Sequence, residues 1–225
     1  MTEAKGVHII RLIAIPAVIT LAVTILRLVG ELQHWPTSLF SRAVGGGNAL
    51  VGIAWMPIIF GPYFALKLTD AGSRPESIGK AIGLAVLGVV AFLPVSGVLL
   101  QLTLRHPSLL TLAMFPLLLV TGFLPFAGWK PLGKTLLAYA LAARIPVLMV
   151  MYFAMRGNGG AGWGTHYDAV APMLAHLPLG RKYLYAAIVP QLTLWIAWTV
   201  ILGAIFGSIV VAIARRGKQS APAEV

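Results

Sequence analysis

The feature that most constrains this chain is a series of apolar runs, each roughly 20 residues long, separated by short polar segments. A helix rises about 1.5 Å per residue, so one such run crosses the hydrocarbon core of a bilayer. The runs lack the alternation of apolar and polar residues that marks a β-barrel strand. In lipid the backbone must satisfy its hydrogen bonds within the protein, and the chain is therefore predicted to be an all-α, polytopic helical membrane protein.

We expect about six transmembrane helices, each with boundaries uncertain by a few residues. The predicted spans are residues 8–30, 48–68, 82–104, 109–128 and 132–155, with a sixth inside 183–214. The sixth stretch exceeds the length of one span, so its start is predicted to lie along the membrane interface before a turn at Pro190. Residues 1–216 are predicted to form a single transmembrane domain, and the polar residues 217–225 a disordered C-terminal tail.

Composition and charge favour a lipid partner over a nucleic acid. The chain is 59% hydrophobic and only 10% charged, far from the balance of soluble domains. Its net charge of +11 does not form one basic patch, because lysine and arginine stand mostly at the ends of apolar runs. Residues in those places fix topology and contact anionic lipid headgroups, so the expected partner is the bilayer, with anionic lipids, and not nucleic acid. The absence of cysteine excludes disulfides and thiol catalysis.

The distribution of basic residues predicts the orientation. Lysine and arginine are more numerous beside the N-terminus, the second and fourth loops and the C-terminus than on the other side. The positive-inside rule then places both termini in the cytoplasm, with the protein as a multi-pass component of the cell membrane. Two longer loops, 31–47 and 156–182, fall on the outer side and are predicted to form an extracytoplasmic cap.

Arg144 is the most informative single residue, because it lies near the middle of the fifth predicted span. A charge at that depth costs about 2.5–3.5 kcal/mol on insertion scales, so Arg144 must face the bundle interior or water. A guanidinium there suits an anionic group such as a carboxylate or phosphate. The alternative is structural: Arg144 donates to a carbonyl freed by a proline or pairs with a carboxylate. No carboxylate falls inside an apolar run, which argues against transport driven by proton or cation binding to buried acids.

Further candidates for ligand binding gather near the outer ends of the spans. Arg27 and Glu31 are spaced for an i,i+4 ion pair at a helix end, although Glu31 could instead face inward as a ligand or as a partner for Arg144. His34, His166 and Asp168 lie in the two outer loops, where a hydrogen-bonded cap is the preferred interpretation. No metal-binding spacing of histidines occurs, so we expect no metal and no cofactor.

Glycine and proline are informative at three other places. Pro57, Gly61 and Pro62 are expected to distort the second span. The pair Gly203 and Gly207 has the small-xxx-small spacing of close helix packing, which we assign to internal packing rather than to a dimer. The run of glycines at 45–47 is expected to form a flexible turn into the second span, or alternatively an anion site at its N-terminus.

Three functional hypotheses remain open from the sequence. The first is a small transporter, channel or lipid-binding permease that handles an anionic or amphipathic ligand near Arg144. The second is an accessory subunit that has no site of its own. The third is a membrane-embedded enzyme whose polar outer residues converge, which is not favoured because no catalytic sequence motif is present. A partner subunit or an oligomer is compatible with each. The candidate ligand-binding residues are Arg144, Arg27, Glu31, His34, His166 and Asp168.

Overall fold

A computed structural model describes residues 8–47 and 49–219, and these residues contain helices and loops but no strand. Five helical segments in this part of the chain are long and apolar enough to cross a membrane. They are Ile9–Leu32 (α1), Ile78–Arg105 (α3), Leu109–Gly128 (α4 and α5), Lys130–Arg156 (α6) and Leu179–Arg215 (α8 to α10). Many large apolar side chains on their outer faces are exposed, as a lipid-facing surface requires. The predicted helical, polytopic membrane fold is confirmed.

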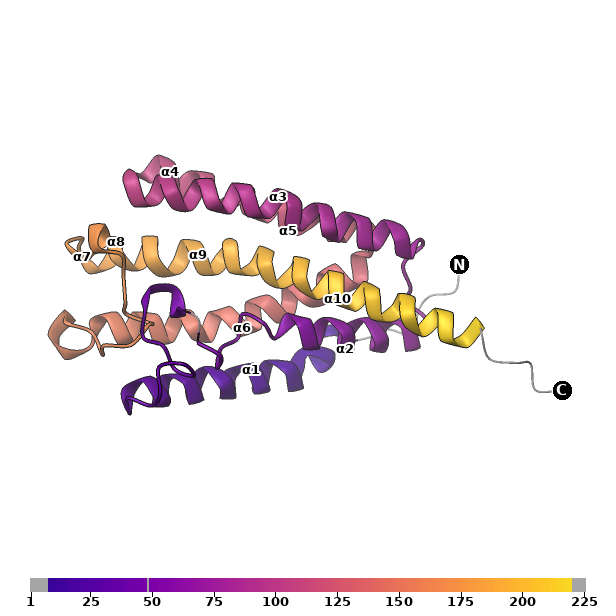
Figure 1. Cartoon of the computed structure of the whole chain (residues 1–225), viewed down its shortest axis with the longest axis horizontal. Helices are drawn as coiled ribbons and strands as arrows, with labels where there is room; N and C mark the ends of the chain where they lie inside the picture. Colours follow the sequence, from indigo (N-terminus) through magenta and orange to yellow (C-terminus); the bar gives the residue numbers. More distant parts are fainter. Residues whose placement is uncertain (1–7, 48, 220–225) are drawn as a thin grey trace.

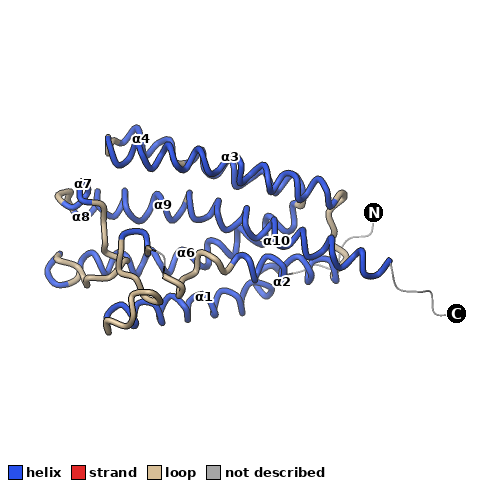
Figure 2. The backbone as a smooth tube through the Cα atoms, in the orientation of Figure 1, coloured by secondary structure: helices blue, strands red, loops and turns tan. Residues whose placement is uncertain are grey.

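The segments lie side by side as an antiparallel bundle (Figure 1). α1 begins and α10 ends at the same end of it. The loops after α1, α3 and α6 gather at the opposite end, as the tube view in Figure 2 makes plain. We call residues 33–56 and 157–178 the cap. The cap includes three short elements: the 3₁₀ turns Val44–Gly46 (η1) and Asn158–Gly160 (η2) and the helix Pro172–Ala175 (α7). The two long loops thus meet at one end, as predicted.

The second predicted span is wrong in its first half. Helix α2 covers only Pro57–Asp70, which is 14 residues and roughly 21 Å of helix, short of the hydrocarbon core. Pro57 occupies the first turn, where its missing N–H is not needed, and residues 49–56 before it are not helical. Two tryptophan side chains form hydrogen bonds with the backbone of this irregular stretch. Trp198 Nε1 donates to the Ala54 carbonyl at 2.9 Å, and Trp55 Nε1 donates to the Leu50 carbonyl at 3.0 Å.

The last spanning segment also differs from its prediction. It contains α8 (Leu179–Tyr183), a π-helical turn η3 (Leu184–Ile188), α9 (Val189–Leu192) and α10 (Leu194–Gln219). These elements follow one line through the bundle, so the predicted interfacial start with a turn at Pro190 is wrong (Figure 1). Helix α10 continues through residues 217–219, which were assigned to the tail, and residues 220–225 lie outside the described part. The fourth segment is interrupted at Phe115, between α4 (Leu109–Met114) and α5 (Pro116–Gly128).

Glycines bring α2 and α10 into direct backbone contact. A Cβ added to Gly207 would lie 2.8 Å from the Gly61 carbonyl oxygen, and one added to Gly61 would collide with the Gly203 carbonyl. Small residues permit such an approach between membrane helices. The prediction that Gly203 and Gly207 serve internal packing is confirmed.

An aromatic layer closes the half of the bundle that lies away from the cap. Phe60 and Phe64 of α2 pack on Tyr139 of α6, with ring centroids 5.4 and 5.5 Å from the tyrosine ring. The Tyr139 hydroxyl and Thr20 Oγ1 of α1 are hydrogen-bonded at 2.8 Å. Phe64 and Tyr139 are almost completely buried. The interior around Tyr139 is therefore filled by aromatic side chains.

The glycine contact yields a test of the packing. Gly61→Ala forces the α2 and α10 backbones apart, and overpacking of this kind costs about 1–3 kcal/mol. We expect a lower midpoint of thermal unfolding for the purified variant in detergent, measured by loss of the monodisperse peak. Gly83→Ala is the matched control, because a Cβ at Gly83 of α3 meets nothing within 4 Å. Equal midpoints for the two variants would contradict the assigned contact.

Candidate functional site

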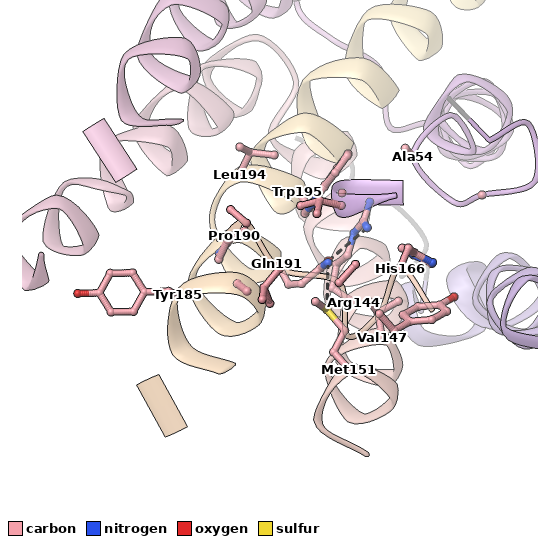
Figure 3. Close-up of a pocket in the computed structure, with 18 of the residues that line it drawn as sticks. Ala54, Arg144, Val147, Met151, His166, Tyr185, Pro190, Gln191, Leu194 and Trp195 are labelled. Atoms are coloured by element: carbon pink, nitrogen blue, oxygen red, sulfur yellow. Dashed lines mark hydrogen bonds between the residues drawn. The ribbon is translucent and has the colours of Figure 1, made fainter. Parts of the chain in front are cut away.

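A cavity of about 280 Å³ lies in the capped half of the bundle (Figure 3). Helices α1, α3 and α6 form its walls together with the segment from η3 to the start of α10, and cap residues complete its lining. Most of its lining is apolar. The polar or charged side chains among the lining residues are those of Thr24, Arg27, Thr103, Arg144, His166, Tyr167, Tyr185, Gln191 and Trp195.

The cavity lies where the second crossing has no helix. Gly52, Ile53 and Ala54, from the irregular stretch before α2, line it directly. Residues 49–56 form bends and a turn, so they do not occupy the cylinder of about 10–12 Å diameter that a helix would fill. The late start of α2 at Pro57 thus leaves a hollow between α1 and α3.

Arg144 of α6 lines this cavity and is only 4% exposed. Its Nη1 donates to Gln191 Oε1 at 3.3 Å, and its guanidinium carbon lies 4.8 Å from the centre of the Trp195 ring. Its Nε has no hydrogen-bond partner among the described residues. No described carboxylate forms an ion pair with it. Neither structural alternative, a freed carbonyl or a carboxylate partner, is therefore observed for Arg144 in the described part of the chain.

Gln191 and Trp195 reach Arg144 because of an irregularity in the last spanning segment. Pro190 cannot donate a backbone hydrogen bond, and the π-helical turn η3 precedes it, as π-turns often do near functional sites. Gln191 Nε2 lies 3.6 Å from Met151 Sδ, which leaves its Oε1 to accept from Arg144. Figure 3 shows Gln191 and Trp195 facing Arg144 from the neighbouring helix.

A second polar cluster joins α1 to the cap, and we call Arg27, Glu31 and His166 the clasp. Arg27 Nε donates to Glu31 Oε1 at 2.8 Å, which confirms the predicted pair. The backbone N–H of His166 donates to Glu31 Oε2 at 2.8 Å, and its ring Nδ1 lies 2.6 Å from Glu31 Oε1. Glu31 is 1% exposed. Its oxygens are thus taken up by the clasp, and the alternative that it pairs with Arg144 is wrong.

Arg27 also fixes the glycine turn of the cap. Its Nη2 donates to the carbonyls of Gly46 at 2.8 Å and Ser41 at 3.1 Å. Gly46 has a φ of +87°, and a Cβ there would lie 2.8 Å from Arg27 Nη2, so both backbone and space require glycine. No helix begins until Pro57, so the expected turn does not lead directly into a helix. The alternative anion site at a helix N-terminus is therefore wrong, and Asn48 lies outside the described residues.

Asp168 and His34 do not reach the cavity. The Asp168 carboxylate accepts hydrogen bonds from the backbone of Gly164 and Thr165 and from the Thr165 hydroxyl, so it folds its own loop. His34 is exposed, and its Nδ1 lies 2.7 Å from Arg42 Nη1. The structure therefore brings Arg144, Arg27 and His166 to the cavity wall, with Glu31 directly behind, and leaves the other two candidates elsewhere.

Several polar lining residues were not among the candidates named from the sequence, including Gln191, Trp195 and Tyr167. Gln191 gave a usable signal, since it is an amide directly after a proline within an apolar stretch. Tyr167 donates to the Thr24 carbonyl of α1 at 3.1 Å, and burial raises the pKa of its hydroxyl. Trp195 gave no signal, because a tryptophan in an apolar run is common and its contact with Arg144 is a tertiary one.

Within residues 8–47 and 49–219, no three histidine, aspartate or glutamate side chains lie close enough together to hold a metal ion. The chain matches no protein-family model, no curated protein and no solved structure. Function must therefore be inferred from the cavity and its residues.

The clasp predicts a pH dependence of stability. Burial is the largest effect on the pKa of His166 and lowers it, and the charge of Arg27 lowers it further. The hydrogen bond to Glu31 and the charge of Asp168 raise this pKa, but the net pKa lies below the ordinary 6.5. The folded protein thus binds this proton less readily than the unfolded chain. This contribution to stability is complete above about pH 6.5 and is lost progressively as the pH falls below that value.

We expect the unfolding midpoint in detergent to drop between pH 7.5 and pH 5.5, and His166→Gln to flatten that dependence. His106→Gln, at an exposed histidine, is the control and should retain the wild-type slope. An unchanged slope in His166→Gln would exclude His166 as its origin.

Proposed function

We propose that the protein is a small lipid-binding permease that takes an amphipathic anion into the cavity of its capped half. One observation carries the proposal: Arg144 presents a buried guanidinium, with no ion-pair partner among the described residues, to an otherwise largely apolar cavity. Such a site provides one charged contact and a long apolar wall. Those are the two features that an amphipathic anion requires.

The energetics support a ligand rather than an empty site. Keeping an arginine near the bilayer centre costs about 2.5–3.5 kcal/mol on insertion scales. Trp195 and Gln191 offset part of that cost through a cation–π contact and a hydrogen bond. A bound anion would neutralise the charge and supply the acceptor that Nε lacks.

The shape of the bundle supports a permease. Below Arg144 the aromatic layer of Phe60, Phe64 and Tyr139 closes the interior, so the cavity belongs to one half of the membrane. Passage of a ligand then requires movement of α2, a half-length helix preceded by irregular chain. Broken helices of this kind surround the substrate sites of many transporters.

The orientation is part of the proposal. The more basic end carries the chain termini and would face the cytoplasm and its anionic lipid headgroups. The capped cavity would then face outward from the cell membrane.

An enzyme remains the second candidate, because one observation favours it. His166 lines the cavity, and its Nδ1 is held by the buried carboxylate of Glu31, the arrangement that orients an imidazole for proton transfer. His34 and Asp168, which the enzyme hypothesis also needed, lie away from the cavity. The enzyme proposal predicts that wild-type protein converts its bound ligand into a product and that His166→Gln abolishes this conversion, whereas a permease releases the ligand chemically unchanged.

Substitution of Arg144 tests the proposed function. In phosphatidylcholine nanodiscs we expect Arg144→Gln to weaken binding of radiolabelled decanoate or decyl phosphate about 10- to 100-fold, as loss of a charge-assisted hydrogen bond implies. The measurement is equilibrium binding to the full chain. Arg156→Gln is the control, because Arg156 is an exposed arginine at the end of the same helix.

Binding of both anions by wild type, with loss only in Arg144→Gln, supports the proposal. Equal binding by both variants, or no binding of either anion by wild type, refutes it. A monodisperse elution profile of Arg144→Gln shows whether the variant folds.

A further inference from the structure

The three guanidinium nitrogens of Arg144 are not equivalent. Nη1 is engaged with Gln191 Oε1 at 3.3 Å. Nε is buried and lacks a partner, and among the described residues Nη2 forms no hydrogen bond. The N–H bonds of Nε and Nη2 point the same way along one edge of the planar group. That edge carries two donors that have no partner in the described part of the chain, and a ligand reaches Nε only when the side chains that cover it move aside.

The neighbours of Arg144 hold this edge in one direction. The Trp195 ring covers a face of the guanidinium, and Gln191 restrains its opposite edge. A carboxylate places two oxygens in one plane and accepts from such an edge through two parallel hydrogen bonds. Sulfate and phosphate groups are tetrahedral, so their remaining oxygens would project out of that plane toward apolar side chains.

The charge balance of the cavity favours a head with one negative charge. Arg27, the other arginine in the lining, is already paired with Glu31 at 2.8 Å and donates to two cap carbonyls. Arg144 is therefore the one guanidinium of the described lining that lacks an ion-pair partner. A dianionic phosphate would leave one charge unpaired against apolar walls, which is costly.

The dimensions of the cavity favour one chain. Its lining extends along the last spanning segment from Trp195 to Tyr185, roughly 15 Å at the rise of a helix. Apolar side chains, among them those of Val147 and Met151 of α6, also line the cavity. A volume of about 280 Å³ is at the low end for small-molecule sites, which favours a slender ligand.

We infer that the ligand is a single-chain monocarboxylate, of the medium-chain fatty-acid class, whose carboxylate binds the Nε and Nη2 edge of Arg144 while its chain lies along the apolar wall toward the cap. This inference rests on the proposed function and names the ligand of the same site.

A head-group series with one chain length tests the inference. The full-length protein in phosphatidylcholine nanodiscs binds radiolabelled decanoate, and unlabelled decanoate, decyl sulfate, decyl phosphate and decanol compete for the site. We expect decanoate to compete about tenfold better than decyl sulfate or decyl phosphate, because only its head is both planar and singly charged. Decanol, which has no charge, should be the weakest competitor.

A second variant isolates the two-donor edge. Arg144→Lys keeps the positive charge but removes the planar donor pair. We expect this variant to bind decanoate and decyl sulfate with about equal affinity, so that the preference for decanoate is lost. Arg156→Lys is the control and should retain the wild-type preference.

The outcomes separate this inference from the proposed function. If decyl sulfate or decyl phosphate competes as well as decanoate, or if Arg144→Lys keeps the preference, the carboxylate assignment is overturned while Arg144-dependent anion binding still stands. If none of the anions binds wild-type protein, both the inference and the proposed function are refuted.

Discussion

The structure depends on one constraint: every backbone polar group inside the membrane must find its hydrogen-bond partner within the protein. Five segments meet it as helices, but the second crossing begins with residues 49–56 outside any helix. That stretch finds partners elsewhere in the protein: the N–H groups of Leu50 and Val51 donate to carbonyls of the cap, and Trp198 of α10 donates to the Ala54 carbonyl. The same exception creates the cavity, since the irregular chain leaves unfilled the volume that a helix would occupy. The site therefore results from the irregular backbone of residues 49–56 in the second crossing.

Two buried polar systems lie on this cavity, and they differ in how completely they are satisfied. In the clasp, Glu31 accepts from Arg27, from the His166 backbone and from the His166 ring. Such a closed network attaches the cap to α1 and leaves little capacity for a ligand. Arg144 has a neutral amide partner and an aromatic neighbour but no described carboxylate. The charge lacking a counterion, rather than the larger polar cluster, identifies where a ligand would bind.

The sequence predicted what depends on local pattern and failed where tertiary contacts decide. The length of the apolar runs located the spanning helices, and the i,i+4 spacing predicted the ion pair of Arg27 with Glu31. The small-xxx-small spacing of Gly203 and Gly207 predicted internal helix packing, which the contact of α10 with α2 provides. Residues 49–56 are as apolar as a spanning helix, so hydropathy could not show that they are irregular. His34 and His166 both lie in polar loops, and only the fold decides that one reaches Glu31 while the other stays exposed. Gln191 and Trp195 became partners of Arg144 through the packing of the last segment on α6, which no local pattern encodes.

The bundle consists of a sealed half and a hollow half, and Arg144 lies at their boundary. On the sealed side, glycines let α2 and α10 touch, and Tyr139 closes the interior with Phe60 and Phe64. On the hollow side, the chain is irregular at two places that meet near Arg144. One is the start of α2, tied to α10 through Trp198, and the other is the break at Thr193 just before Trp195. Helix interruptions are the places where a bundle bends at least cost. Under the proposed function, a ligand that engages Arg144 and Trp195 would therefore contact the segment that directly follows one of these interruptions.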